Sequence, residues 1–168
     1  MTIALSPGPT YPADRGAVYL PIVAVAPVDP VATFYDLLMH DIRQQRSRLT
    51  VCRALEAAAA WKAADIAAND YWDHRAFNGE WPNDTARRFG CNLPPEYSDG
   101  QNYIESLCAG SADAQAMFDS LAESPSHRTH LFGLNDFFSR QTHVGIACAV
   151  GGRWGWVWAI YIAECTSS

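Results

Sequence analysis

Seven polar side chains in this sequence are of types that could bind or react. His127 and His130 stand three residues apart, so a regular helix would place both on one face, where they could form a zinc pair. A surface or capping role is the alternative for either histidine. No HExxH, GxSxG or glycine-rich phosphate loop is present. The seven candidates are His74, Gln101, Glu105, Glu123, Ser124, His127 and His130.

Two side-chain amides stand at the centre of the segment SDGQNYIES, residues 98–106. The segment begins as a loop and ends as a short strand, and Gln101 and Asn102 follow the glycine at the join. Taken by themselves, these amides are typical turn residues. Their place at the entry of a strand allows a second interpretation, in which they reach into a site.

The composition is that of a globular domain. The chain has 168 residues, of which 49% are hydrophobic, and this length suits one domain with a real core. A net charge of −6 without a basic cluster excludes a nucleic-acid partner, because no positive surplus is left to neutralise phosphates. No apolar run reaches the roughly 20 residues of a membrane span, so we expect no transmembrane segment.

The first 32 residues differ from the rest. They hold six of the ten prolines and no helical period, which predicts a proline-rich N-terminal leader or linker over residues 1–32 and a domain over residues 33–168. The apolar stretch 17–28 also allows a poor signal peptide, with Ala24-Val25-Ala26 as a cleavage-like triplet. Whether the leader is cleaved stays open.

Five cysteines are many for a cytosolic domain of this size, and none forms a CxxC pair. In an oxidising compartment we expect two disulfides and one free thiol, with the pairing undetermined. The alternative is five buried thiols that act as small hydrophobic residues. The cysteines are Cys52, Cys91, Cys108, Cys148 and Cys165.

Helical periodicity dominates the first two thirds of the domain. A helix is predicted to begin at a capping box at Thr33 and to end in the basic segment 43–48, where positive charge suits a helix C-terminus. An alanine-rich helix follows over 51–72, with Leu55 and Ile66 on its apolar face. Shorter helices are expected over 84–89, over 111–123 from an N-cap at Ser111, and in a turn that stops at Gly133.

The last third predicts a β-hairpin. Two β-rich runs, THVGIACAV and RWGWVWAIYIA, flank Gly151-Gly152. In the second run Trp154, Trp156, Trp158, Ile160 and Ile162 alternate onto one face, which we expect to pack under helices. Helices that precede closing strands predict an α+β fold with helices covering an antiparallel sheet.

The order of four segments resembles the CAP superfamily, which groups cysteine-rich secretory proteins, antigen 5 and pathogenesis-related class 1 proteins, and most of all its bacterial SCP-domain branch. The segments are AADIAANDYWDH, DGQNYIES, SLAESPSHRTHLFG and HVGIACAVGGRWGWVWAIYIA, and the resemblance covers about residues 33–165. It implies an α-β-α sandwich with a central cleft, in which two histidines and two acidic residues often hold a divalent metal.

The resemblance assigns the cleft residue by residue. His74 matches the first histidine, His127 the histidine of the Ser-Pro-x-His-Arg element, and Ser124 falls near the second acidic position. Gln101 stands where the first glutamate is expected, whereas Asn102 keeps the expected type. Because an amide brings no charge to offset a dication, zinc at His74 and His127 is doubtful and no cofactor is required. Glu105 or Glu123 could supply the missing carboxylate.

Three functions follow from this resemblance. The first is a secreted or surface-exposed module that binds a lipid, glycan or protein partner through the cleft without catalysis. The second is a metal-assisted or serine hydrolase, with Ser124 as nucleophile and His74 or His127 as base. The third is a structural domain whose histidines only tie the helices to the sheet. We expect the binding module, because the amide at Gln101 cannot stabilise an imidazolium as a carboxylate does.

Overall fold

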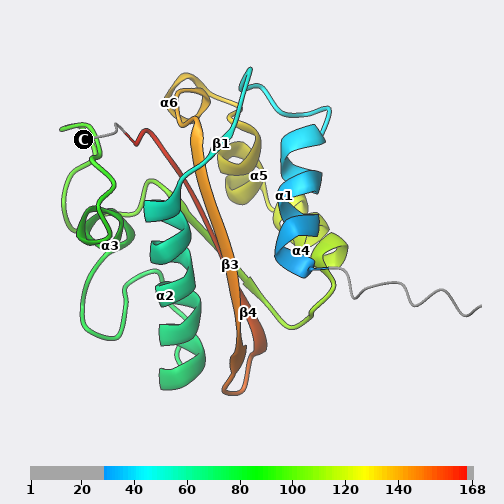
Figure 1. The fold of residues 1–168 in the computed structure, drawn as a ribbon, viewed down its shortest axis with the longest axis vertical. Helices are drawn as coiled ribbons and strands as arrows, with labels where there is room; N and C mark the ends of the chain where they lie inside the picture. Colours follow the sequence, from blue (N-terminus) through cyan, green and yellow to red (C-terminus); the bar gives the residue numbers. More distant parts are fainter. Residues whose placement is uncertain (1–28, 166–168) are drawn as a thin grey trace, which may run out of the picture.

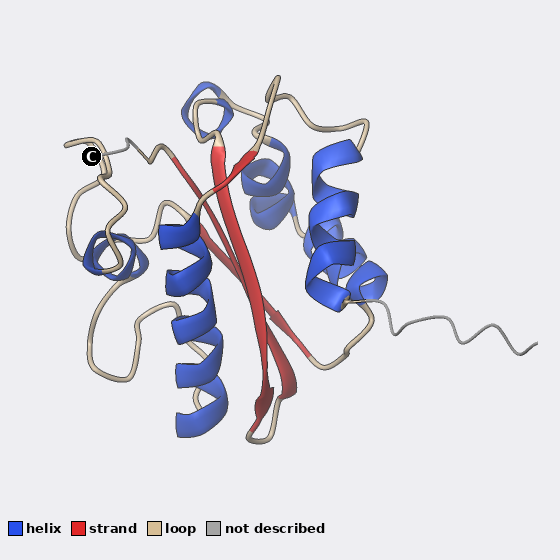
Figure 2. Ribbon diagram, in the orientation of Figure 1, coloured by secondary structure: helices blue, strands red, loops and turns tan. Residues whose placement is uncertain are grey.

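Residues 29–165 are described in a computed structural model, and they form three layers. Helices α2 (Arg53–Asn69) and α3 (Pro82–Arg88) cover one face of a central sheet. Helices α1 (Pro30–His40), α4 (Ala114–Glu123) and α5 (Pro125–Phe132) cover the other face, and the short α6 (Asp136–Ser139) lies at one end (Figures 1 and 2). The predicted α+β sandwich is confirmed. No helix within residues 29–165 is long and apolar enough to cross a membrane.

Within the described residues, the central sheet has four strands in the order β1-β3-β4-β2. The predicted hairpin is present as β3 (His143–Gly151) and β4 (Gly155–Ala163), and β2 (Glu105–Ala109) pairs antiparallel to β4 at one edge. At the other edge β1 (Thr50–Val51) pairs parallel to β3. The sequence predicted an antiparallel sheet, so the prediction differs from the structure at this edge. Two residues are too few to show a strand period in the sequence.

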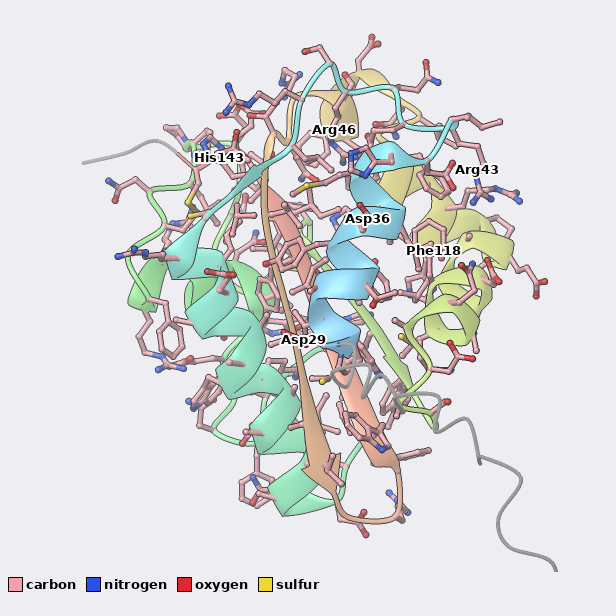
Figure 3. The ribbon with its side chains drawn as sticks, turned by 45° about the vertical axis from the view of Figure 1, so that its right-hand side comes forward. Asp29, Asp36, Arg43, Arg46, Phe118 and His143 are labelled. Atoms are coloured by element: carbon pink, nitrogen blue, oxygen red, sulfur yellow. A yellow bond between two sulfur atoms is a disulfide. The ribbon has the colours of Figure 1, made fainter. Side chains whose placement is uncertain are left out.

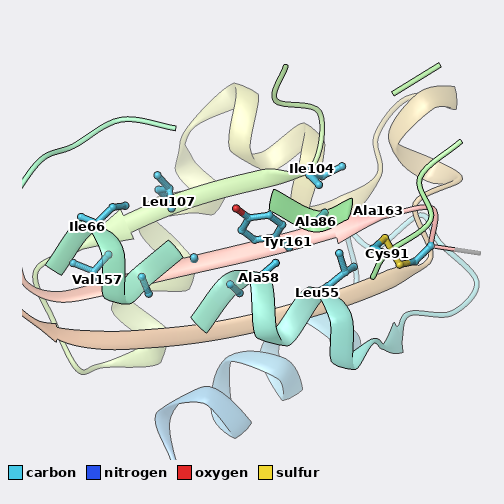
Figure 4. Close-up of a cluster of buried hydrophobic side chains, with 14 of the residues drawn as sticks. Leu55, Ala58, Ile66, Ala86, Cys91, Ile104, Leu107, Val157, Tyr161 and Ala163 are labelled. Carbon is cyan, nitrogen blue, oxygen red and sulfur yellow. A yellow bond between two sulfur atoms is a disulfide. The ribbon is translucent and has the colours of Figure 1, made fainter. Parts of the chain in front are cut away.

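Close contact between α2 and β3 anchors the first core. A Cβ atom on Gly145 would lie 2.1 Å from the carbonyl carbon of Leu55, so only glycine lets the helix approach this near. The apolar face of α2 packs here against β2 and β4, as Figure 4 shows for Leu55, Ile66, Leu107 and Tyr161. The small alanine side chains on this face of α2 therefore allow the helix to pack closely against the sheet.

A second core lies on the opposite face of the sheet. Trp158, Ile160 and Ile162 point from β4 toward α1, α4 and α5, so these three members of the predicted strip pack under helices. Figure 3 shows α1 and α2 on opposite sides of β3, with Arg43 and Phe118 on the α1 side. Trp154 departs from the strip because it precedes β4 and contacts Trp72 at a ring distance of 4.9 Å.

Helix starts differ from the sequence prediction at several points. Asp29 caps α1 by accepting from the amide of Val31, so the helix begins three residues before the predicted Thr33 and includes residues assigned to the leader. Asp113, not Ser111, caps α4. In α3 the Asp84 carboxylate accepts from the amide of Trp81, so it lies within the first turn. An acidic side chain can cap from either position, which sequence spacing does not resolve.

The basic segment 43–48 has a different role from the one predicted. Helix α1 ends at His40, and Ile42 is 99% exposed. The buried Arg46 guanidinium instead donates to the carbonyl oxygens of His130 and Leu131, at 2.7 and 2.8 Å, at the C-terminus of α5. Burial lowers the pKa of Arg46 to about 10. The charge still suits a helix C-terminus, but that helix lies much further along the chain.

One disulfide is present instead of the two predicted. It joins Cys91 to Cys165, and Cys52, Cys108 and Cys148 are free. Cys108 and Cys148 both pair with Trp158 from its two sides, so two strand spacings separate them. That is about 9–10 Å, beyond the reach of about 7 Å for a disulfide. Burial raises the pKa of the Cys108 thiol to about 12.

Candidate functional site

The loop that carries His74 is fixed by the buried lysine of α2. Lys62 is 1% exposed, and its ammonium donates to the carbonyl oxygens of Asp73 and His74, each at 2.8 Å, and to the Tyr71 hydroxyl at 3.0 Å. These three acceptors use all of its protons. The Asp65 carboxylate accepts from the Tyr71 hydroxyl and from the amide of Phe77. Residues 71–77 are therefore held in place by α2.

His74 contacts a buried carboxylate. Its Nδ1 lies 2.7 Å from Oε1 of Glu105, a side chain with 0% exposure, while the other oxygen accepts from the Tyr161 hydroxyl at 2.5 Å. A carboxylate only accepts, so Nδ1 of His74 carries the proton. Burial and Glu105 raise the pKa of Tyr161 well above its usual value, which keeps the phenol a donor. Nε2 of His74 makes no hydrogen bond within residues 29–165 and lies beside the cavity.

His127 faces the same space from the opposite layer. It lies on α5 and lines, together with His74, a cavity of about 160 Å³ and an adjoining one of about 300 Å³. Burial lowers the pKa of His127, and the nearby His74 lowers it further. His127 is therefore neutral at pH 7. The cleft presents two hydrogen-bonding imidazole rings, with the buried Glu105 carboxylate behind His74.

The second histidine of α5 is buried. His130 accepts at Nδ1 from the Ser106 hydroxyl at 2.8 Å, and its Nε2 donates to the carbonyl oxygen of Ile162 at 3.4 Å. Burial, then the Arg46 charge, lowers the pKa of His130 to about 3. Ser106 and His130 have the contact of a nucleophile and its base, but a base of pKa about 3 takes up a proton poorly at neutral pH.

The remaining sequence candidates occupy different places. Asn102 lines the cavity, but its side chain is engaged with the amides of Ile104 and Glu105, which it bends into β2. Gln101 is exposed and does not line the cavity. The side chain that contacts His74 is instead the carboxylate of Glu105. Ser124 precedes α5, and its hydroxyl contacts that of Ser126 at 3.4 Å. Glu123 is exposed at the end of α4.

The donor set does not fit a metal centre. Within residues 29–165 no group of three or more histidine, cysteine or acidic side chains could hold an ion. Both oxygens of Glu105 are engaged, and His74 and His127 offer two ring nitrogens at most. A structural or catalytic zinc needs three or four protein ligands. Zinc at this site is therefore unsupported by the residues present.

No protein-family model and no curated protein matches this sequence. Solved structures share its fold, and two of them are as follows. An outer surface protein from Borrelia burgdorferi superposes with a TM-score of 0.63 at 16% identity, covering 84% of this chain and 97% of that one. An extracellular protein containing an SCP domain, from Bacillus anthracis, gives 0.60 at 18% identity, covering 80% of this chain and 40% of that one. The chain has a CAP/SCP-like fold.

Sequence reasoning missed two buried groups of this SCP-like cleft. Lys62 supports the His74 loop and Tyr161 supports Glu105, and neither stood out in the sequence. The signal for Lys62 was its place on the apolar face of an alanine-rich helix, where a lone cation needs partners. Tyr161 gave no signal, because an aromatic residue in a strand is ordinary core composition.

Proposed function

We propose that this chain is a secreted or cell-surface binding module that takes its partner in the cleft between His74 and His127. Two similar structures support the setting, since one is an outer surface protein and the other an extracellular protein. The five cysteines and the Cys91–Cys165 disulfide fit an oxidising compartment. The partner would be a lipid, a glycan or a protein segment.

One observation carries the proposal. The Glu105 carboxylate holds Nδ1 of His74, so Nε2 remains for a ligand in a cavity that His127 also lines. A fixed imidazole held by a second layer of buried groups is preorganised for recognition. A purely structural histidine would need neither a cavity beside it nor a tautomer that leaves a nitrogen unused. This feature favours binding over the structural alternative.

Hydrolysis has weaker support. The candidate nucleophile Ser124 contacts Ser126 and has no hydrogen bond to a histidine within residues 29–165. Ser106 does contact a histidine, but it is 1% exposed and its partner His130 has a pKa of about 3. An activated serine needs a base whose pKa lies near the working pH. Neither pair meets this requirement.

The test is a ligand screen read at the histidine rings. Maltotriose, laurate and a proline-rich decapeptide are titrated separately into the 15N-histidine-labelled protein at pH 7. We expect one probe to shift the ring signals of His74 and His127 in a saturable way. The variant His127→Ala should lose that binding, because it removes one wall of the cavity. If no probe moves either ring, the proposed binding function is wrong.

An exposed histidine supplies the matched control. His40 lies on α1 with a side chain 76% exposed, and no residue of α1 lines the cleft. His40→Ala should therefore leave the affinity unchanged. Melting temperatures of both variants separate binding from stability. Should His127→Ala lower only the melting temperature and leave affinity intact, the structural alternative would replace the binding proposal.

A further inference from the structure

The cleft continues into a third, larger hollow. A trough of about 620 Å³ lies along the loop 71–79 and shares Trp72 and Asp73 with the 300 Å³ cavity, which in turn shares His74 and His127 with the first cavity. Shared lining residues make the three hollows neighbours in a row. Trp72 therefore stands where the histidine cleft opens into the trough.

Trp72 is an exposed aromatic platform with a rigid support. Its side chain is 41% exposed, and its ring lies 4.9 Å from that of Trp154. The indole nitrogen of Trp154 donates to the carbonyl oxygen of Tyr71 at 2.9 Å, and the Arg153 guanidinium lies 4.9 Å from the Trp154 ring. A tryptophan that exposes a ring while its neighbours hold it still is poised for stacking. Phe77, 70% exposed, extends the apolar wall.

Polar groups beside the platform are also fixed. One carboxylate oxygen of Asp73 accepts from the amide of Arg75 at 2.8 Å, and the other accepts no hydrogen bond from residues 29–165. The Arg75 guanidinium is held across the loop by the carbonyl oxygen of Gly79 at 3.1 Å. The trough thus offers an acceptor and a donor beside an aromatic face, the mixture that orients a small ligand.

We propose that the trough is a subsite for a neutral pyranose oligosaccharide, whose next residue would enter the histidine cleft. This inference rests on the proposed binding function. A pyranose ring has a carbon–hydrogen face that stacks on an aromatic ring and a rim of hydroxyls that bond to groups such as Asp73, Arg75 and Nε2 of His74. The three hollows in a row suit a chain of sugar units.

Charge and shape favour this ligand over the other classes. An acyl chain would need enclosed apolar volume, whereas the trough is open and includes Asp73 and Arg75. A sulfated or phosphorylated glycan would need a basic cluster, but the chain carries a net charge of −6 and Asp73 lies beside Arg75. A neutral, hydroxyl-rich ligand meets neither objection.

The experiment measures tryptophan fluorescence during titration with maltotriose, cellotriose and chitotriose. We expect at least one of these neutral sugars to bind saturably, and Trp72→Ala to weaken it at least tenfold. Trp61→Ala is the matched control, because Trp61 lies on α2 against Phe89, outside the three hollows, and should leave affinity unchanged. Arg75→Ala should also weaken sugar binding, and because Arg75 is exposed this change does not disturb the packing of aromatic side chains.

Each other outcome overturns the subsite. If a sugar binds equally well to Trp72→Ala but is lost in His127→Ala, the cleft binds sugar and the trough does not. If laurate or the proline-rich decapeptide binds in a Trp72-dependent way while no sugar does, the glycan assignment is wrong although the binding function stands. If no trisaccharide binds the wild type, the subsite proposal fails. Loss of the binding function itself is read separately, from the histidine ring signals.

Discussion

Glu105 and Ser106 are consecutive residues of β2, yet they hold two histidines that come from opposite layers. Successive side chains of a strand point to opposite faces, so Glu105 reaches His74 on the α2 side and Ser106 reaches His130 on the α5 side. Both strand residues are buried. This edge strand therefore sets the positions of the His74 loop and of α5 relative to each other.

Replacing Glu105 with glutamine tests the carboxylate behind His74. The amide keeps the shape, but it can donate as well as accept, and it removes the negative charge near Lys62. We expect a loss of about 1–3 kcal/mol in the free energy of unfolding, measured by urea denaturation, and a mixture of His74 tautomers in 15N spectra. Glu123→Gln, at an exposed position, should change neither. A single Nδ1–H tautomer in Glu105→Gln would contradict this role of the carboxylate.

The buried His130 predicts a loss of stability in acid. Its pKa is about 3 in the folded chain and near its usual 6.5 when unfolded, so the unfolded state binds the proton first as pH falls. Its contribution is fully present above pH 6.5 and is lost as pH falls toward 3, at about 1.4 kcal/mol per pH unit within that window. In His130→Asn, whose side chain cannot titrate, the free energy of unfolding should depend less steeply on pH between about pH 6 and pH 4, by the equivalent of one bound proton. An equal slope in both proteins would refute this.

The thiol of Cys52 lies beside the disulfide, which predicts that Cys165 bonds to Cys52 when Cys91 is removed. Cys52 Sγ lies 3.6 Å from Cys165 Sγ, although Cys165 is bonded to Cys91. In Cys91→Ser, oxidised with glutathione disulfide, we expect a Cys52–Cys165 bond, because the remaining thiols are already neighbours. Non-reducing digestion and mass spectrometry would detect the linked peptides. The double variant Cys52→Ser/Cys91→Ser should lack them, and a Cys165 that stays reduced in the single variant would contradict the expectation.

The contact at Gly145 predicts a large loss of stability from one methyl group. In Gly145→Ala the new Cβ would meet the backbone of Leu55 at 2.1 Å, so α2 must shift or the variant must unfold. Overpacking of this kind costs about 1–3 kcal/mol or more. Gly151→Ala on the same strand is the comparison, since its Cβ would meet the Ala67 side chain and carbonyl oxygen only at 3.2 Å. Thermal melting should rank Gly145→Ala as the less stable; equal values would contradict the packing argument.

The sequence was sufficient for the hairpin and the longer helices because their signals are local. Gly151-Gly152 marks a turn, and the alternating run after it predicts a strand whose Trp158 packs under helices. The two-residue β1 and the four-residue α6 are too short to produce a period, so both were missed. The predicted helix starts were wrong where two nearby acidic or hydroxyl residues could each serve as the cap, as Ser111 and Asp113 could for α4.

The cleft was harder to derive because its contacts join distant parts of the chain. The resemblance selected His74 and His127, and the structure brings both to one cavity. It placed Gln101 at the acidic position, whereas the carboxylate beside His74 belongs to Glu105, four residues later at the start of β2. Which residue meets His74 depends on where the loop ends and the strand pleat begins. Asn102 sets that point through backbone contacts that no residue pattern displays.

Among residues 29–165, strand β2 has a neighbouring strand on one side only. It pairs with β4 and ends the sheet, so its outer edge would be open to the backbone of another chain. The histidine cavities lie along this strand, from Ile104 to Leu107, between the His74 loop and α5. The same groups that form the cleft thus shield the rim of the sheet from strand addition. Variants that loosen the His74 loop should be judged for self-association as well as for lost binding.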